Sequence, residues 1–240
     1  PNAVVDNLGM MSTGRRIDIA SDLGMESAWT YGGNVTFYIP MGYEDNSYLS
    51  LDYFRSDFTN QIIVDQEYDW SAVSIYNLEG PSYTNTWQVD FSVEPFERFT
   101  VLATFRYTDS KVWLRDRGLV ERPLVSRYKG VLNLQYATRM NIWTFDFTAQ
   151  LNGPSRLPDF AVAPGESGLS PVYTVLFAQI TRKFKGVDVY VGVENITNYR
   201  QEHPIIGAEN PWSADFNASV IWGPLTGVTA YAGVRFTLWK

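Results

Sequence analysis

The fold class is decided by the stretch Val228-Thr229-Ala230-Tyr231-Ala232-Gly233-Val234-Arg235-Phe236-Thr237-Leu238. Every second position carries an apolar side chain, namely Val228, Ala230, Ala232, Val234, Phe236 and Leu238. The positions between them carry a hydroxyl group, a charge or no side chain, namely Thr229, Tyr231, Gly233, Arg235 and Thr237. Because successive side chains of a strand point to opposite faces of a sheet, this alternation predicts a β-strand with one apolar and one polar face.

The same period of two recurs through the chain, whereas helical periodicity is almost absent. Clear cases lie at residues 87–93, 99–108, 143–151 and 187–194. We predict nine strands, at residues 27–40, 47–64, 73–94, 98–114, 124–138, 141–151, 170–184, 187–197 and 227–238. Residues 1–24 are predicted to be irregular. No repeat or linker divides the chain, so we expect one architectural unit.

The predicted connections alternate in length along the chain. Short ones lie at residues 41–46, 95–98, 139–141 and 185–186, and long ones at 65–72, 115–123, 152–170 and 198–226. Tight turns on one rim and long loops on the other are typical of outer-membrane barrels. Several predicted strands also exceed the ~5–6 residues common in globular sheets and reach the ~9–11 residues of a membrane-spanning strand. The predicted fold class is therefore all-β, an antiparallel transmembrane β-barrel.

A soluble β-sandwich is the main alternative for the fold, because it also has one apolar and one polar face. In a barrel the apolar face meets lipid and the polar face lines a lumen. The lumen would then hold the charged residues of the polar faces: Asp90, Arg106, Asp146, Glu194 and Arg235. In a sandwich the apolar face is covered by a second sheet. Loop sorting and strand length favour the barrel, and tryptophans near strand ends fit an interface girdle: Trp29, Trp113, Trp222 and Trp239.

Composition narrows the function. Phe, Trp and Tyr contribute 14, 8 and 15 of the 240 residues, and such amphipathic rings suit a membrane interface. The net charge of −7 argues against a nucleic-acid partner, which needs a basic surface. The absence of cysteine excludes disulfides and thiolate chemistry. No apolar run approaches the ~20 residues of a membrane helix.

Nothing in the sequence indicates catalysis or a bound cofactor. His203 is the only histidine and there is no cysteine, so the sequence gives no indication of a Ser/His/Asp triad and effectively excludes a His/Cys zinc site. No G-x-G-x-x-G opens a helix, so no dinucleotide site is indicated. We predict no enzyme activity, no catalytic residue, no cofactor and no metal site.

Candidate ligand-binding residues are confined to the long connections. The run Asp65-Gln66-Glu67-Tyr68-Asp69-Trp70 combines carboxylates with aromatic rings, which can hold a cation or stack on a sugar. Its plainer interpretation is a solvated acidic hairpin tip. Arginines in the next long connection can grip an anion, or form a self-neutralising surface cluster with Asp116. The candidates are Asp65, Glu67, Tyr68, Trp70, Arg115, Arg117, His203, Glu209 and Trp212.

A family resemblance is carried by four parts of the chain, in order. They are Glu26-Ser27-Ala28-Trp29-Thr30-Tyr31-Gly32; Asp52-Tyr53-Phe54-Arg55-Ser56-Asp57-Phe58-Thr59-Asn60-Gln61-Ile62-Ile63-Val64-Asp65; Gly192-Val193-Glu194-Asn195-Ile196-Thr197-Asn198-Tyr199; and a last group, Phe216-Asn217-Ala218-Ser219, Trp222-Gly223-Pro224 and Tyr231-Ala232-Gly233-Val234-Arg235-Phe236. Together they resemble the last third of TonB-dependent receptors of the Bacteroidetes type.

This resemblance implies a 22-stranded barrel with a plugged lumen, of which the chain supplies the last nine or so strands. Residues 1–240 would be the C-terminal part of one barrel domain, with residues 1–24 as an irregular lead-in and with the plug and earlier strands absent. Barrels of this kind usually end on an aromatic residue, whereas here Trp239 is followed by Lys240.

The function implied is active uptake of a scarce nutrient, such as a siderophore, cobalamin, metal chelate, peptide or glycan, in the bacterial outer membrane. The implied partners are outer-membrane lipid, the plug, a TonB-type energy-coupling protein acting through the missing N-terminal part, and the nutrient; a surface lipoprotein is a further candidate. Alternatives are a smaller autonomous barrel, either a porin or an outer-membrane enzyme, and a soluble sandwich that binds a ligand. The odd strand count disfavours an autonomous barrel.

Overall fold

The computed structural model describes residues 5, 7–43, 45–162 and 167–238. Its strands are β1 Arg16–Ile19, β2 Ser27–Ile39, β3 Ser47–Asn60, β4 Ile62–Asp65, β5 Ala72–Asn77, β6 Ser82–Phe96, β7 Phe99–Leu114, β8 Gly118–Glu121, β9 Tyr128–Ala137, β10 Trp143–Asn152, β11 Tyr173–Phe184, β12 Val187–Glu194 and β13 Thr229–Phe236. Three short 3₁₀ turns lie at Leu8–Met11, Arg139–Asn141 and Asp159–Ala161. No helix in the described part of the chain is long and apolar enough to cross a membrane.

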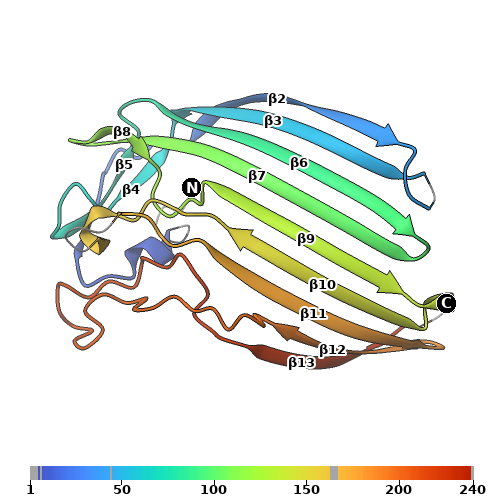
Figure 1. Ribbon diagram of the computed structural model, residues 1–240. Helices are drawn as coiled ribbons and strands as arrows, with labels where there is room; N and C mark the ends of the chain where they lie inside the picture. The colour runs from blue at the N-terminus through green and yellow to red at the C-terminus, as the bar shows by residue number, and fades with distance from the viewer. Residues whose placement is uncertain (1–4, 6, 44, 163–166, 239–240) are drawn as a thin grey trace.

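One curved antiparallel sheet of ten strands makes up the body of the protein (Figure 1). Nine strands follow the order β13-β12-β11-β10-β9-β7-β6-β3-β2, and β8 pairs with the end of β7. We call these nine strands the wall. A separate sheet of order β1-β5-β4 lies at one end of the wall. The wall is open, because β2 and β13 are its two edges and are not paired with each other.

The sequence predicts the wall well and the small sheet poorly. The predicted strand 47–64 divides at Gln61 into β3 and β4, and the predicted strand 73–94 divides into β5 and β6. Gly80 and Pro81 interrupt the second run, since proline cannot donate to a sheet ladder. Two strands lie where none was predicted: β1 in the supposedly irregular lead-in, and β8 in a predicted long loop. Both expectations were wrong for the same reason, because four-residue strands are too short to show a period.

The connections are sorted by length between the two ends of the wall (Figure 1). Residues 40–46, 97–98, 138–142 and 185–186 connect strands at one end, the short-turn rim. Residues 61–81, 115–127, 153–172 and 195–228 connect them at the other end, the long-loop rim, where the small sheet also lies. The predicted sorting of tight turns and long loops is confirmed.

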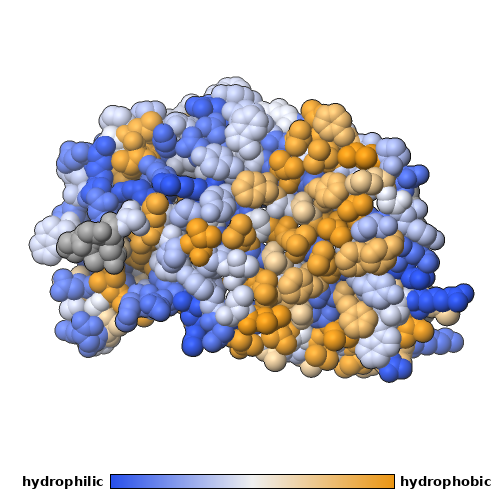
Figure 2. All heavy atoms as spheres, viewed as in Figure 1, coloured by the Kyte–Doolittle hydropathy of each residue, from blue (hydrophilic) through white to orange (hydrophobic). Residues whose placement is uncertain are grey.

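The apolar side chains of the wall form continuous rows across neighbouring strands. In one row Val35 pairs with Leu51, Leu51 with Val89 and Val89 with Phe105. These side chains face solvent: Val35 is 54% exposed and Leu51 42%. Figure 2 shows apolar groups gathered over the strands on this face.

No second sheet covers the apolar face among the described residues. Val234 and Phe236 on the edge strand β13, and Val228 just before it, are exposed, although the sandwich alternative would bury them. The buried cluster of Ile63, Tyr76, Val112 and Leu114 belongs to the long-loop rim instead. The structure is therefore a piece of barrel wall and not a sandwich.

Aromatic side chains bound the apolar face at both ends. Towards the long loops Tyr53, Trp87, Tyr107 and Tyr128 pair in register, with the Tyr53 and Trp87 ring centroids 4.1 Å apart. Towards the short turns lie Phe99, Tyr136, Trp143, Phe184 and Phe236. Phe99 and Tyr107 of β7, one in each row, are eight residue steps apart, or about 26 Å along the strand. At the ~40° tilt usual for barrel strands this is about 20 Å along the membrane normal, the same order as the ~25 Å lipid-facing band of membrane barrels.

The predicted tryptophan girdle differs from these aromatic rows. Trp29 lies exposed near the start of β2. Trp113 instead packs over Gly80, and Trp222 packs against Tyr173 and Tyr199 in the long-loop rim. Trp239 lies outside the described residues. Tyrosine and phenylalanine supply most of the interface rows.

Candidate functional site

The long-loop rim is a folded cap and not a set of solvated loops. β4 and β5 pair with each other, and their inner residues pack against the ends of β7 and β8. Tyr76 of β5 is almost fully buried between them and donates its hydroxyl hydrogen to Asp65 Oδ2 over 2.6 Å. Burial and this hydrogen bond raise the pKa of Tyr76. The other carboxylate oxygen of Asp65 accepts the backbone N–H groups of Glu67 and Tyr68. Asp65 therefore fixes the turn after β4.

A buried carboxylate joins three long connections at this rim. The Glu67 side chain is 2% exposed and accepts two hydrogen bonds from Arg156, at 2.7 and 2.9 Å. It also accepts the backbone N–H of Asp159 at 2.9 Å. Arg117 lies 3.6 Å from Glu67 and pairs with Asp159 at 2.5 Å. Partial burial opposes ionisation of Asp159, but the hydrogen bond and charge of Arg117 outweigh it and lower the pKa of Asp159.

A second ion pair ties the β7–β8 hairpin to the segment after β5. The guanidinium of Arg115 pairs with Glu79 and lies over the ring of Tyr76, 3.9 Å from its centroid. The hydrogen bond from Arg115 lowers the pKa of Glu79. Arg115 and Arg117 are thus neutralised by Glu79, Glu67 and Asp159, and not by Asp116 as a self-contained surface cluster would require.

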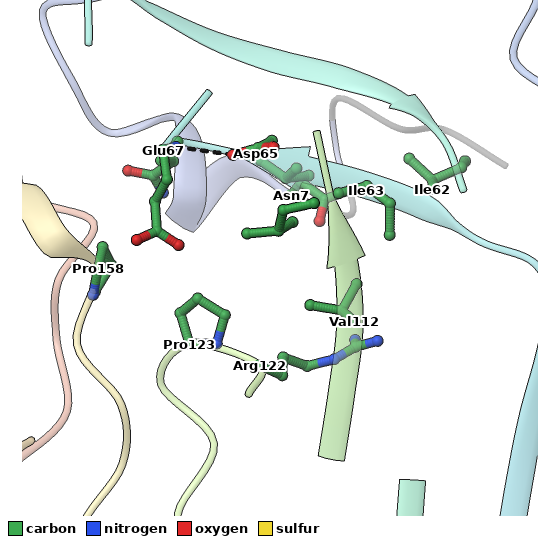
Figure 3. A pocket seen from close by; sticks show the side chains of 12 residues that line it. Asn7, Ile62, Ile63, Asp65, Glu67, Val112, Arg122, Pro123 and Pro158 are labelled. Carbon is green, nitrogen blue, oxygen red and sulfur yellow. Dashed lines mark hydrogen bonds between the residues drawn. The ribbon is translucent and has the colours of Figure 1, made fainter. Parts of the chain in front are cut away.

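A cavity of about 170 Å³ lies inside the cap (Figure 3). Most of its lining is apolar, from Ile62, Ile63, Val112, Pro123 and Pro158. Arg122 reaches it from below, and Asp65 and Glu67 lie at its other side. Because both carboxylates already accept hydrogen bonds within the cap, the cavity offers a ligand mainly apolar contact.

The structure divides the predicted ligand-binding residues into two groups. Asp65, Glu67, Arg115 and Arg117 are held in the cap by the contacts above. The solvated hairpin tip was therefore a wrong expectation for Asp65 and Glu67. The other candidates are exposed on the surface of the long-loop rim: Tyr68, Trp70, His203, Glu209 and Trp212. Their role in ligand binding stays a prediction.

Trp70 borders a surface cavity of about 160 Å³ formed by distant parts of the chain. Arg15 and Phe160 also line it, with the Arg15 guanidinium 4.5 Å from the Phe160 ring centroid. Ile206 and Asp215 bring the last long connection to the same place. Hydrogen bonds to Gln66 at 2.7 and 2.9 Å fix the position of the Arg15 guanidinium. The cavity beside Trp70 is therefore lined by a positively charged group held in place.

The polar face of the wall holds a further cleft, of about 260 Å³, just below the long-loop rim. Gln150, Asn152 and Glu194 line it, and none of these side chains forms a hydrogen bond or ion pair within the described residues. The ring of Tyr173 closes one side, stacked on Tyr199 with centroids 4.8 Å apart. Three open polar groups beside an aromatic stack can hydrogen-bond a ligand and contact an apolar surface on it.

The sequence analysis placed Glu194 in the lumen but did not single out Gln150 and Asn152 as candidate ligand-binding residues. The alternation in β10 could have indicated them, since both lie on its polar side. Part of the polar face is internally hydrogen-bonded: Arg106 donates to Gln88 at 2.9 Å, and Thr104 donates to Asp90 at 2.5 Å. Which polar side chains are paired in this way and which stay open, as in the cleft, is visible only in the structure.

Comparison with known proteins gives matches in structure alone. No family model matches the chain, and no curated protein matches it in sequence. The FrpB iron transporter of Neisseria meningitidis (F3-3 variant) has a TM-score of 0.60 at 12% identity, and the match covers 92% of this chain and 32% of that one. The ferric-catecholate import receptor Fiu of E. coli K12 has 0.58 at 14% identity, covering 91% and 29%. The chain has the fold of a receptor barrel wall.

A third similar structure is the ferric enterobactin receptor PfeA of Pseudomonas aeruginosa, with a TM-score of 0.58 at 14% identity. The match covers 87% of this chain and 31% of that one. The solved structures are TonB-dependent outer-membrane receptors, transporters rather than enzymes. The chain spans about a third of the length of each.

Proposed function

We propose that this chain is the wall and outer-loop part of a TonB-dependent receptor that takes up a scarce nutrient across the bacterial outer membrane. The observation that carries the proposal is the apolar face of the wall, exposed along its rows and bounded by aromatic residues at both ends. Such a face is stable where lipid covers it. The fold shared with three receptors supports the same conclusion.

We further propose that residues 1–240 form the C-terminal part of one barrel domain. Further strands would extend the wall from its open edges, because an unpaired edge cannot remain in lipid. The plug and the segment that contacts the energy-coupling protein would lie in the rest of the receptor. The Bacteroidetes type rests on the sequence stretches alone and stays a prediction.

In this proposal the nutrient is captured at the long-loop rim and passes the polar cleft of the wall. Trp70, Trp212, His203 and Glu209 are exposed at the rim, and Gln150, Asn152 and Glu194 stand open below it. The similar structures are by name an iron transporter, a ferric-catecholate import receptor and a ferric enterobactin receptor. For this chain the proposal includes siderophores, cobalamin, metal chelates, peptides and glycans, with a surface lipoprotein as a further partner.

Single-cysteine labelling tests the proposed membrane orientation, because residues 1–240 contain no cysteine and any cysteine in the rest of the receptor can be replaced by serine. Trp212 in the long-loop rim and Met140 in the short-turn rim are 94% and 85% exposed, which makes them a matched pair. In the full-length protein, Trp212→Cys should react with a membrane-impermeant maleimide on intact cells. Met140→Cys should react only after the outer membrane is permeabilised.

Equal labelling of both variants on intact cells would contradict the proposal, as would recovery of the full-length protein in the soluble fraction. A further readout is nutrient uptake in cells that express the receptor. Uptake that persists after collapse of the inner-membrane proton gradient would exclude an energy-coupled receptor and leave a passive channel.

A further inference from the structure

Arg182 occupies an unusual place at the short-turn rim. Its residue pairs in register with Trp143 and Val189, on the apolar face of the wall, two positions beyond the exposed Ile180. The guanidinium lies between two aromatic rings, 4.9 Å from the centroid of Trp143 and 4.9 Å from that of Phe184. The rings fix the plane of the guanidinium through cation–π contacts.

Within the described residues, the guanidinium of Arg182 forms no ion pair with a carboxylate and contacts only these two rings. A second arginine on the same face of the wall behaves differently. Arg55, towards the long-loop rim, also lies over an aromatic ring but forms an ion pair with Asp57 at 2.7 Å. On the neighbouring strand β12, Asp188 lies opposite Lys183 in register and therefore on the polar face, away from Arg182.

A guanidinium beside lipid is costly without an anion, because little water reaches it there. Its planar fork of N–H donors matches a phosphate, which can accept two hydrogen bonds from it. Arg139 and Lys185 are exposed in the two adjacent turns and add positive charge at the same rim. The anion within reach of this position in a membrane is the phosphate of a lipid headgroup.

We propose that Arg182, held between Trp143 and Phe184, binds the phosphate of a phospholipid in the leaflet at the short-turn rim. The inference rests on the proposed membrane function, since only a lipid-facing wall brings headgroups to this position. The bound lipid anchors the short-turn rim at a fixed depth in the bilayer. It also supplies the counter-charge that Asp57 supplies to Arg55 at the opposite rim.

The test compares Arg182→Gln with Lys183→Gln in the full-length protein, purified in detergent and titrated with short-chain phosphatidylglycerol. The two residues are neighbours of like charge on opposite faces of β11, so the second variant is a matched control. Native mass spectrometry measures the bound lipid. Arg182→Gln should bind phosphatidylglycerol about tenfold more weakly than the wild type, as expected when a charge-assisted bidentate contact is lost. Lys183→Gln should bind as the wild type does.

Equal lipid binding by both variants would overturn the site, and so would a tenfold loss in Lys183→Gln. Inorganic phosphate is the second arm: it should fail to displace the lipid, and displacement by free phosphate at similar concentration would overturn the lipid assignment. Membrane insertion is measured for every variant by a heat-dependent gel shift. If the wild type shows no shift, the proposed function fails; if all variants shift but bind lipid equally, only the Arg182 site fails.

Discussion

The wall and the long-loop rim place charge and apolar surface in opposite ways. On the wall, apolar side chains such as Leu51 and Phe105 are exposed, and polar groups gather on the other face. In the rim, Ile63 and Tyr76 are buried in a core, and the carboxylate of Glu67 is buried with Arg156. The rim thus follows the rules of a protein folded in water, whereas the wall follows those of a protein folded in lipid.

This difference shows which part of the chain depends on the surrounding solvent or lipid for its stability. Burial of apolar area stabilises a fold only where that area leaves water. The rim buries its own apolar residues and so can hold its shape in water. The wall leaves its rows exposed, and under the proposed membrane function lipid stabilises them. A change in the rim should therefore be felt in detergent and membrane alike, and a change on the wall should depend on the face that it touches.

The largest expected effect comes from the buried charge of the rim. Replacing Glu67 by Leu removes the two hydrogen bonds of 2.7 and 2.9 Å from the Arg156 guanidinium, which is only 15% exposed. The guanidinium keeps only its longer contacts, to Asp159 at 3.2 Å and to the Glu121 carbonyl at 3.5 Å. Losing the main partner of a buried charge in this way costs up to about 3–5 kcal/mol. We expect the long-loop rim to open, seen as faster amide hydrogen exchange in residues 61–81 and 153–162. Glu209→Leu, at an exposed position in the same rim, is the control.

A double variant sharpens this test. Glu67→Leu combined with Arg156→Met replaces both charges by apolar groups and should recover much of the loss, because no charge is left unpaired. If the single variant exchanged hydrogen as slowly as the wild type, Glu67 would not be the link between the three connections, and the contrast between rim and wall would lose its main support.

The second largest effect is expected for substitutions in the wall, where the loss of stability depends on whether the residue lies on the apolar or the polar face. Leu132 lies in the middle of the apolar face, and Gln135 lies on the polar face of the same strand, where it donates to Asp146. Leu132→Arg should cost about 2–4 kcal/mol in a bilayer, as for an arginine at the midplane of a barrel. Gln135→Arg keeps a donor for Asp146 and should cost little. Urea unfolding in vesicles measures both.

The opposite ranking of these two variants would reverse the assignment of the faces and put Leu132 inside. Similar losses in both would mean that neither face meets lipid. The comparison therefore tests the wall independently of the rim, because neither residue contacts the cap.

The two regions also differ in how far the sequence predicts them. The strands of the wall follow from a local pattern, because alternation in β13 or β10 is visible within about ten residues. Their order in the sheet then follows, because consecutive long strands joined by a turn pair with each other. Of the rim, only the exposed aromatic residues could be inferred. Glu67 and Arg156 are 89 positions apart, and no local pattern connects a glutamate to an arginine at that distance.

For the same reason, the polarity of the residues gave a wrong prediction at the rim. A run with three carboxylates is typical of a solvent-exposed turn, yet Asp65 is nearly fully buried. Its burial is possible because the Tyr76 hydroxyl and two backbone N–H groups donate hydrogen bonds to its carboxylate. The open cleft at Gln150 and Asn152 is the reverse case: these residues look like any other polar positions of a strand. Whether a polar group finds a hydrogen-bond partner depends on residues that lie far away in the sequence, and a local pattern does not reveal them.

A smaller effect is expected for the hydroxyl of Tyr76. Tyr76→Phe removes the donor to Asp65 Oδ2 and leaves that oxygen buried and unpaired, which costs about 1–3 kcal/mol. The loss should appear as local opening of residues 61–81 by hydrogen exchange, without a change in the wall. A matched control is Tyr68→Phe, whose ring is half exposed. Equal protection in both variants would show that the turn after β4 does not depend on the hydrogen bond between Tyr76 and Asp65.

The smallest effect, at the surface of the rim, is a dependence on pH. The hydrogen bond from Arg115 lowers the pKa of Glu79 below its ordinary value of about 4.3. A carboxyl with a lowered pKa in the folded state stabilises that state fully above the ordinary value. The contribution is lost as the pH falls through the lower, folded value. Because the pair is largely exposed, it should be worth less than about 1 kcal/mol.

Hydrogen exchange of the β7–β8 hairpin, residues 111–121, measures this dependence in the wild type and in Glu79→Gln. Wild-type protection should exceed that of the variant at pH 6, and the two should converge as the pH falls through the lowered pKa of Glu79. A gap that stayed constant with pH would mean that the Glu79 side chain acts through packing alone. A gap that closed would show that even the outermost contacts of the rim are stabilised by charge, in contrast to the wall, whose outward surface we propose to be stabilised by lipid.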